Sequence, residues 1–159
     1  MADFDFLSKY LVPNEQHSNA EPFNSYKHKF FPVKTEVINE VLQLIKIPKE
    51  LNHLYKSIGY GFLHAQNTNQ INRLFDPYSF KQINLREEYY KFDPDIDLYN
   101  DESYLGKLIF FELNDGVYLM IEKNDTNGKN PIYYFDRKIA ESLEEFLKKM
   151  DEIPNYFEK

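Results

Sequence analysis

Apolar residues recur along the chain at helical spacings, and the clearest example lies between Ile47 and Phe62. Pro48 suits the first turn of a helix there, because its missing N–H has no partner to lose. Gly59 and Gly61 can take the positive φ angles that end a helix. One apolar face is predicted from residues spaced three, four and seven positions apart: Leu51, Leu54, Tyr55 and Ile58.

Two further helices are predicted upstream, separated by an extended arm. Residues 3–11 favour a short helix with Asp3 as its N-cap, and its apolar residues are Phe6, Leu7, Tyr10 and Leu11. Residues 12–32 carry three prolines among Asn, Ser and Gln, which indicates extended chain. Thr35 is placed to cap a helix over Glu36–Ile45, whose apolar residues are Val37, Ile38, Val41, Leu42 and Ile45.

After the glycines, short apolar runs predict strands at Gly61–His64 and Ile71–Phe75. Asp76-Pro77 then has the cap and first-turn chemistry of a helix that reaches Leu85. Residues 86–106 follow, REEYYKFDPDIDLYNDESYLG, and show neither a helical nor a strand period. We predict a long surface insertion with partial helix, and insertions of this length are often functional.

A hairpin is predicted where Asn114-Asp115-Gly116 separates two apolar runs, since this is a strong turn signal. Its strands are Leu108–Leu113 and Val117–Glu122, and Pro131–Phe135 is a third strand. Lys138–Met150 is predicted as a closing helix, with one apolar face formed by Ile139, Leu143, Phe146, Leu147 and Met150.

Length and composition indicate one folded domain without disulfides. The chain has 159 residues, of which 17% are aromatic, a content that excludes a disordered protein. It contains no cysteine, which excludes thiolate catalysis and Cys-based zinc sites. The predicted divisions are an N-terminal helix and arm (1–34), a main domain (35–150) and a C-terminal tail (151–159).

The N-terminus lacks the positive charge and apolar run of a signal peptide. No apolar run approaches the roughly 20 residues that a membrane helix requires. We therefore expect a cytoplasmic protein with no membrane partner.

The net charge of −7 is concentrated in the middle of the chain. Residues 84–125 hold four Lys/Arg against eleven Asp/Glu, whereas residues 1–83 sum to +1 and residues 126–159 to −1. Nucleic-acid binding is disfavoured, because it requires a basic surface to neutralise phosphates. An acidic patch instead favours a basic protein partner and steers its approach.

The acidic insertion is the candidate partner-binding segment. Carboxylates can compete for a basic surface while tyrosines bury area and anchor the contact. The alternative is a solvated insertion whose aromatic residues pack onto the sheet. Together with Tyr60 near the glycine turn, the candidate residues are Glu87, Glu88, Tyr89, Tyr90, Asp93, Asp95, Asp97, Tyr99, Asp101, Glu102 and Tyr104.

The sequence contains few features of an enzyme or a metal protein. It has no G-x-S-x-G elbow, P-loop or G-x-G-x-x-G motif. An EF-hand loop starting at Asp93 would place Leu98 and Tyr104 where Gly and Glu are required. Metal-ligand spacing is also missing among the histidines, which are His17, His28, His53 and His64. We predict no catalytic site, metal or cofactor; a hydrolase with an Asp/Glu pair is the enzymatic alternative, but no pair stands out.

Taken in order, several of these motifs resemble the Smi1/Knr4 (SUKH) superfamily over roughly residues 35–150. Ile47-Pro48 and the helix ending at Gly59 and Gly61 are similar to the family's LP step and glycine-rich turn. Gly116–Met120 is similar to its G-x-Y/V-x-hydrophobic strand, Pro131–Asp136 to its strand ending in an aromatic-Asp pair, and Ile139–Leu147 to its closing helix. Two features depart from the pattern: Ser57-Ile58 replaces the usual asparagine, and residues 86–106 have no counterpart.

The resemblance implies an α+β fold in which helices pack on a twisted, mainly antiparallel sheet. It also implies a non-catalytic binding role, since many bacterial members resemble immunity proteins that neutralise polymorphic toxins, often nucleases, by stoichiometric binding. The expected partner is then a basic toxin domain. A regulatory or scaffold module of cell-wall or stress signalling, which fungal relatives resemble, is the alternative.

Overall fold

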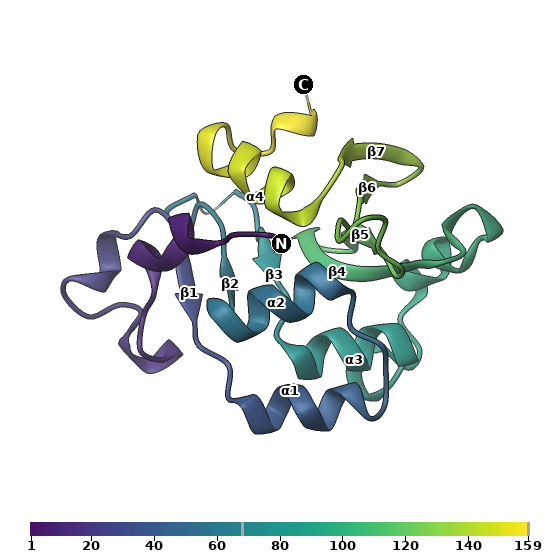
Figure 1. Cartoon of the computed structure of the whole chain (residues 1–159), viewed down its shortest axis with the longest axis horizontal. Coiled ribbons are helices and arrows are strands. Elements are labelled where there is room, and N and C mark those ends of the chain that lie inside the picture. Colours follow the sequence, from purple (N-terminus) through teal and green to yellow (C-terminus); the bar gives the residue numbers. More distant parts are fainter. Residues whose placement is uncertain (68, 159) are drawn as a thin grey trace.

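Seven strands form a single antiparallel sheet in the computed structural model, which describes residues 1–67 and 69–158 (Figure 1). Each strand pairs with its neighbours in sequence, so the order across the sheet is β1 to β7. With its helices, the sheet confirms the predicted α+β class. The strands are β1 Lys29–Phe31, β2 Tyr60–Phe62, β3 Arg73–Leu74, β4 Lys107–Asn114, β5 Val117–Glu122, β6 Ile132–Tyr134 and β7 Arg137–Ala140.

Four α-helices and seven short 3₁₀ turns complete the fold. In Figure 1, α4 lies above α2, and α1 and α3 lie below it. None of the described helices is long and apolar enough to cross a membrane. The helices are α1 Thr35–Leu42, α2 Lys49–Ser57, α3 Pro77–Leu85 and α4 Leu143–Glu152. The 3₁₀ turns are η1 Asp5–Tyr10, η2 Glu15–His17, η3 Phe23–Ser25, η4 Glu88–Tyr90, η5 Pro94–Asn100, η6 Glu102–Tyr104 and η7 Tyr156–Glu158.

One face of the sheet is closed by helices and forms the core. Residues that lie directly opposite each other on neighbouring strands form a row across the sheet, and their side chains lie on the same face. The row on the closed face contains four fully buried side chains: Phe30, Leu74, Phe111 and Leu119. Phe146 of α4 meets the ring of Phe111 edge-on, with 5.5 Å between centroids.

The helix predicted around Leu51 is present as α2, and its four predicted apolar residues are buried. Gly59 has a φ of +136°, as predicted. The prediction is wrong for Gly61, which lies in strand β2 and does not have a positive φ angle. A Cβ at Gly61 would lie 2.0 Å from the carbonyl oxygen of Lys29, and one at Gly59 would lie 1.9 Å from that of Phe31. Both glycines therefore provide the space in which β2 approaches β1.

The predicted helix over Lys138–Met150 is wrong at its start. Residues Arg137–Ala140 form strand β7 against β6, and α4 begins only at Leu143. Ser142 is the N-cap, since its hydroxyl accepts a hydrogen bond from the backbone N–H of Glu145 at 3.0 Å. Ile139 was predicted as part of the apolar face of this helix. It lies in β7 instead, and the strand and the helix both direct apolar side chains toward the core.

The N-terminal region is more structured than predicted. The arm at 12–32 contains strand β1, which three residues could not reveal by periodicity, and Phe30 in it is fully buried. The first helix is a 3₁₀ turn in which Leu7 is buried, as predicted. Helix α1 ends earlier than predicted, and Thr35 is its first residue rather than a side-chain cap.

The central hairpin and the helix before the insertion are confirmed. Strands β4 and β5 join at Asp115-Gly116, where Gly116 has a φ of +77°. Pro77 opens α3, and the carboxylate of Asp76 accepts a hydrogen bond from the N–H of Ser79 at 3.2 Å. Local turn and cap chemistry therefore sets both elements.

A buried carboxylate ties α2 to the start of α4. Glu50 is 2% exposed, and its Oε1 accepts hydrogen bonds from the backbone N–H groups of Asn130 at 2.6 Å and Leu143 at 3.0 Å. Its Oε2 accepts a third from the N–H of Glu144 at 3.2 Å. Burial raises the pKa of Glu50, although these three bonds favour the anion. Glu50 therefore satisfies amides that the first turn of a helix leaves without partners.

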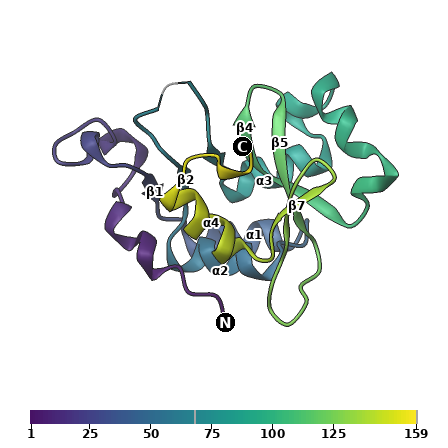
Figure 2. The ribbon, with the colours of Figure 1, turned by 90° about the horizontal axis from the view of Figure 1, so that it is seen from above.

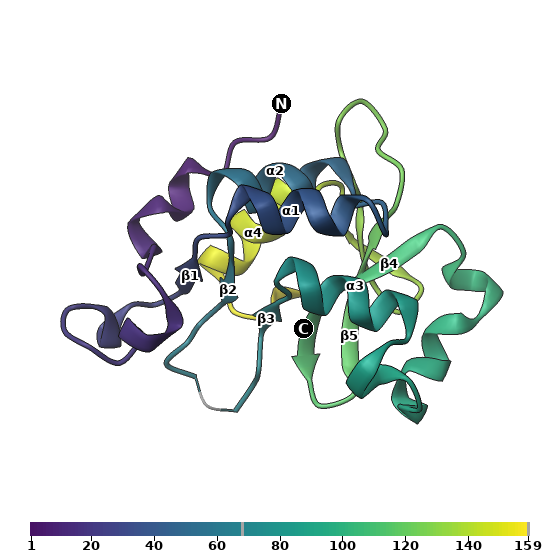
Figure 3. The same ribbon diagram turned by 90° about the horizontal axis from the view of Figure 1, so that it is seen from below.

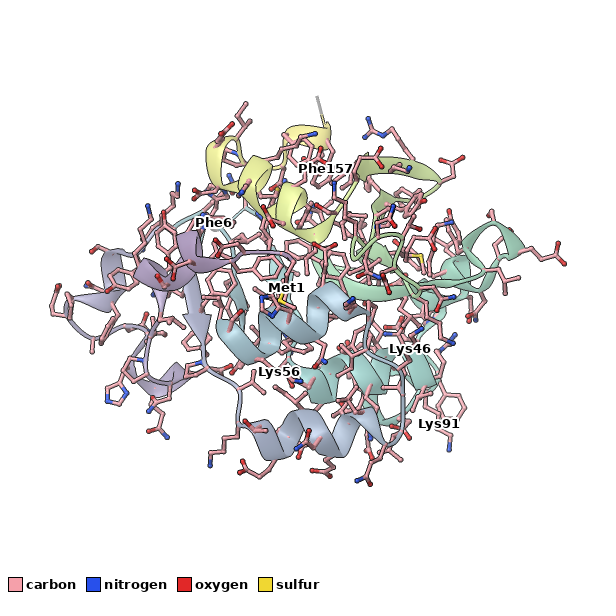
Figure 4. The ribbon with its side chains drawn as sticks, viewed as in Figure 1. Met1, Phe6, Lys46, Lys56, Lys91 and Phe157 are labelled. Atoms are coloured by element: carbon pink, nitrogen blue, oxygen red, sulfur yellow. The ribbon has the colours of Figure 1, made fainter. Side chains whose placement is uncertain are left out.

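The residues after α4 also pack on the core. Phe157 is 3% exposed and its ring lies 5.1 Å from that of Tyr134 (Figure 4). The hydroxyl of Tyr156 donates a hydrogen bond to the carbonyl of Ile139 in β7. This segment covers the last strand of the sheet.

Candidate partner-binding surface

The acidic insertion projects beside α3 and the β4–β5 hairpin, at the opposite end of the molecule from the N-terminal arm (Figures 2 and 3). It contains the turns η4, η5 and η6. The prediction of partial helix is confirmed, in the 3₁₀ form.

One contact holds the insertion to the sheet, and a second group of contacts braces it internally. Tyr99 is 6% exposed, and its hydroxyl donates to the carbonyl of Tyr118 at 3.3 Å and accepts from its N–H at 2.9 Å. The guanidinium of Arg86 donates to the carbonyls of Tyr90 and Asp93, both at 3.1 Å, and pairs with the carboxylate of Asp97 at 3.1 Å. Tyr99 therefore fixes the insertion to β5, and Arg86 links the turns of the segment to one another.

Several predicted contact residues have partners inside the segment. Asp93 accepts from the N–H of Asp95, and Asp101 accepts from the N–H and hydroxyl of Ser103. These local bonds lower the pKa of the Asp101 carboxyl. Glu87 has its partner outside the segment, since it pairs with Lys81 of α3 at 2.9 Å.

The other predicted residues divide by exposure. Tyr90 and Tyr104 are half-buried, and Tyr99 is buried beneath the segment. Three of the predicted acids are exposed and have no hydrogen bond or ion pair to another described residue at their carboxylates: Glu88, Asp95 and Glu102.

Tyr60 lies apart from the other candidates. It belongs to β2, its hydroxyl bonds the carboxylate of Glu15 at 2.5 Å, and its ring packs near Phe31. Those contacts connect it to the N-terminal arm, which Figure 1 shows at the other end of the molecule from the insertion.

The insertion also exposes large apolar side chains. Four of its residues are the most exposed of this class in the described chain after Met1: Phe92 at 85%, Leu105 at 84%, Tyr89 at 81% and Leu98 at 63%. Exposed apolar groups amid polar ones are typical of interaction sites. Leu98 and Leu105 are neither acids nor tyrosines, so they were not among the predicted contact residues. Their signal in the sequence is that they are apolar residues in a segment with neither a helical nor a strand period.

A hollow of about 680 Å³ lies where the insertion meets the open face of the sheet. Its floor comes from Arg73, Glu112 and Tyr118, three residues paired across β3 to β5. The residues lining it that matter here are Tyr89, Phe92, Asp95, Glu112, Asp115 and Tyr118. One feature of the sequence could have identified Glu112 as a candidate: it is a charged residue inside an otherwise apolar strand.

The hollow carries an excess of negative charge. No hydrogen bond or ion pair to another described residue is recorded for the carboxylates of Asp95, Glu112 or Asp115. The guanidinium of Arg73, the cation at this site, is already bonded to Asp76 at 3.0 Å and to Ser79 at 2.9 Å. Burial raises the pKa of Glu112, although the charge of Arg73 acts in the opposite direction.

Two of the four histidines, His28 and His64, lie next to each other, with their rings edge-on and 4.6 Å between centroids. His28 is fully buried; its Nε2 lies 2.8 Å from the carboxylate of Asp151, and its Nδ1 accepts from the N–H of His64 at 2.9 Å. Both ring nitrogens of His28 are thus engaged by contacts within the fold. Within residues 1–67 and 69–158, no group of three or more His, Asp or Glu side chains is placed to hold a metal ion.

Comparisons with known proteins point to one family. A family model described as SUKH_6, SMI1-KNR4 cell-wall, matches residues 40–147, more than half of the chain and including the whole insertion. The immunity protein YxxD of Bacillus subtilis (strain 168) is 44% identical over 133 residues, which cover 82% of this chain and 88% of that relative. No solved structure is significantly similar to the chain.

Proposed function

The chain belongs to the SMI1-KNR4 (SUKH) family, and from this premise we propose that it is an immunity protein that neutralises a toxin by binding it. The observation that carries the proposal is the 44% identity to a protein named as an immunity protein, over most of both chains. We propose that it acts in the cytoplasm, without catalysis, by blocking the toxin in a stoichiometric complex.

We place the toxin contact on the exposed part of the acidic insertion. Within the described part of the chain no hydrogen bond or ion pair engages the carboxylates of Glu88, Asp95 and Glu102, and Tyr89 and Phe92 offer exposed aromatic area. Nucleases carry basic surfaces that hold phosphate backbones, so a basic nuclease domain is the partner that this charge fits. Tyr99 supports the surface from below and does not contact the toxin. Tyr60 is left out of this contact, because it packs with the arm.

Co-expression with a candidate toxin domain found in the gene neighbourhood tests the role. We expect growth to be restored, and a mixture of purified proteins to lose toxin activity at one equivalent of the chain. The toxin should keep its intact mass and regain activity after denaturing separation. Protection at far less than one equivalent, with a covalently altered toxin, would contradict stoichiometric binding. A chain that protects against no neighbouring toxin favours the scaffold alternative.

The surface is tested by charge reversal. The variant Glu88→Lys/Asp95→Lys should increase the toxin dissociation rate by about tenfold or more, because like charges then face each other. The melting temperature should stay unchanged, since neither carboxylate has an internal partner. Glu36→Lys is the matched control: Glu36 is an exposed acid of α1 without a recorded partner. Equal dissociation rates for the two variants would remove the insertion from the interface.

A further inference from the structure

The open face of the sheet and the insertion together form a site with a definite chemical preference. Tyr118 and Glu112 stand side by side on the floor as a cross-strand pair, and Asp95 reaches the hairpin turn, where its carboxylate lies against Gly116. Tyr89 and Phe92 form the wall. Aromatic faces and carboxylates therefore converge on one hollow.

The charge of this hollow selects a cation. Asp95, Glu112 and Asp115 have no recorded partner in the described chain, while Arg73 is already engaged by Asp76. An anionic ligand would meet three carboxylates, and the cation in the described lining, Arg73, is already bonded to Asp76. A purely apolar ligand would leave the half-buried Glu112 without a partner, which is costly for a charged group.

We infer that the hollow binds the guanidinium group of an arginine presented by a basic protein segment. The inference rests on the proposed function, because the toxin is then the source of that arginine. A guanidinium stacks on aromatic rings and bonds two carboxylate oxygens at once, whereas an ammonium is a more strongly hydrated point charge. The chain shows the same chemistry beside the hollow: the guanidinium of Arg73 lies 4.9 Å from the ring centre of Phe75 and pairs with Asp76.

An arginine in this place would be a central contact of the complex. Desolvated Arg side chains packed among aromatic residues are typical of interface hot spots. The surrounding Tyr89 and Phe92 would exclude water from the contact. The site thus gives the acidic insertion a specific anchor in addition to its general charge.

The probe is the blocked peptide N-acetyl-Gly-Arg-Gly-amide, titrated into the ¹⁵N-labelled full chain. We expect saturable shifts at the amides of Tyr89, Phe92, Glu112 and Tyr118, with a millimolar dissociation constant. The same peptide with citrulline, which has the shape of arginine without its charge, should give no saturable shifts. A lysine peptide should bind several-fold more weakly, because it cannot stack or form the double bond.

Glu112→Gln should raise the dissociation constant of the arginine peptide about tenfold, which is the loss of roughly one charge-assisted hydrogen bond. Glu102→Gln is the matched control, since Glu102 is an exposed acid of the insertion outside the hollow. Equal shifts with arginine and citrulline, absence of saturable shifts, or equal effects of the two substitutions would overturn the inference.

The purified toxin complex separates this inference from the proposed function. Glu112→Gln should accelerate toxin dissociation about tenfold, while Glu36→Gln should leave it unchanged. A chain that protects against the toxin with an unaltered rate in Glu112→Gln overturns the arginine site alone. Arginine-peptide binding in a chain that binds no toxin overturns the proposed function and leaves the site.

Discussion

Two carboxylates removed from water, Glu50 on the closed side of the sheet and Glu112 on the open side, have opposite surroundings. Burial raises the pKa of both. Glu50 accepts three backbone hydrogen bonds, whereas no internal partner of Glu112 is recorded among the described residues. A satisfied buried carboxylate holds a fold together, and an unsatisfied one is a cost that a ligand can remove. The contrast separates the part of the molecule that sustains the fold from the part that we propose meets a partner.

Removing the Glu50 carboxylate should have the largest effect on stability. In Glu50→Ala, three backbone N–H groups lose a buried acceptor, so we expect the free energy of unfolding to fall by about 4 kcal/mol. Urea denaturation at neutral pH measures it. Glu102→Ala, an exposed acid, should change the value by no more than about 0.5 kcal/mol. A decrease in the free energy of unfolding below about 1 kcal/mol in Glu50→Ala would contradict the structural role that distinguishes Glu50 from Glu112.

The closed side should also lose stability on acidification through His28. Burial lowers the pKa of His28 to about 4, below its ordinary value of 6.5. The unfolded chain therefore takes up the proton first, so the contribution of His28 is complete above pH 6.5 and is lost as the pH falls toward 4. The loss amounts to about 3 kcal/mol.

Urea denaturation between neutral pH and pH 4 measures this loss. His28→Gln should flatten the pH dependence in that interval, because its side chain takes up no proton. His17→Gln, which changes an exposed histidine, should keep the wild-type slope. Parallel curves for the wild type and His28→Gln would show that another group is responsible.

Glu112→Gln should have the smallest effect on stability and the opposite sign. The raised pKa means that the Glu112 anion is less favourable in the folded chain than in the unfolded one. At neutral pH the substitution should therefore leave the free energy of unfolding unchanged or raise it by less than about 1 kcal/mol. The gain should vanish in acid, where the carboxyl is protonated in both states. A destabilisation comparable to that of Glu50→Ala would make Glu112 structural.

Much of the fold follows from local signals. The hairpin at Asp115-Gly116, the Asp76-Pro77 helix start and the apolar face of α2 each depend on residues close in sequence. Strands β1 and β7 do not, because three or four residues carry no reliable period and become strands by pairing with β2 and β6. Ser142 was nevertheless a local cap signal that would have separated β7 from α4.

The candidate site divides in the same way. Composition located the acidic insertion, because its charge and tyrosines are contiguous. Composition could not add Arg73, Glu112 and Tyr118, which come together only through the register of three strands. Nor could it distinguish Asp95, which has no recorded partner, from Asp93, which caps a turn.

The order of the strands has a consequence for how the chain folds. Each strand pairs with the one made just before it, so no pairing has to wait for a later strand, and the longest connections, before β2 and before β4, are filled by helices or by the insertion. Helix α4, however, follows all seven strands and supplies Phe146 to the closed face. During synthesis the sheet can therefore assemble progressively, while Phe111 stays uncovered until α4 has left the ribosome. Protection of the aromatic face is a late event, and a chain interrupted before α4 is exposed to aggregation and proteolysis.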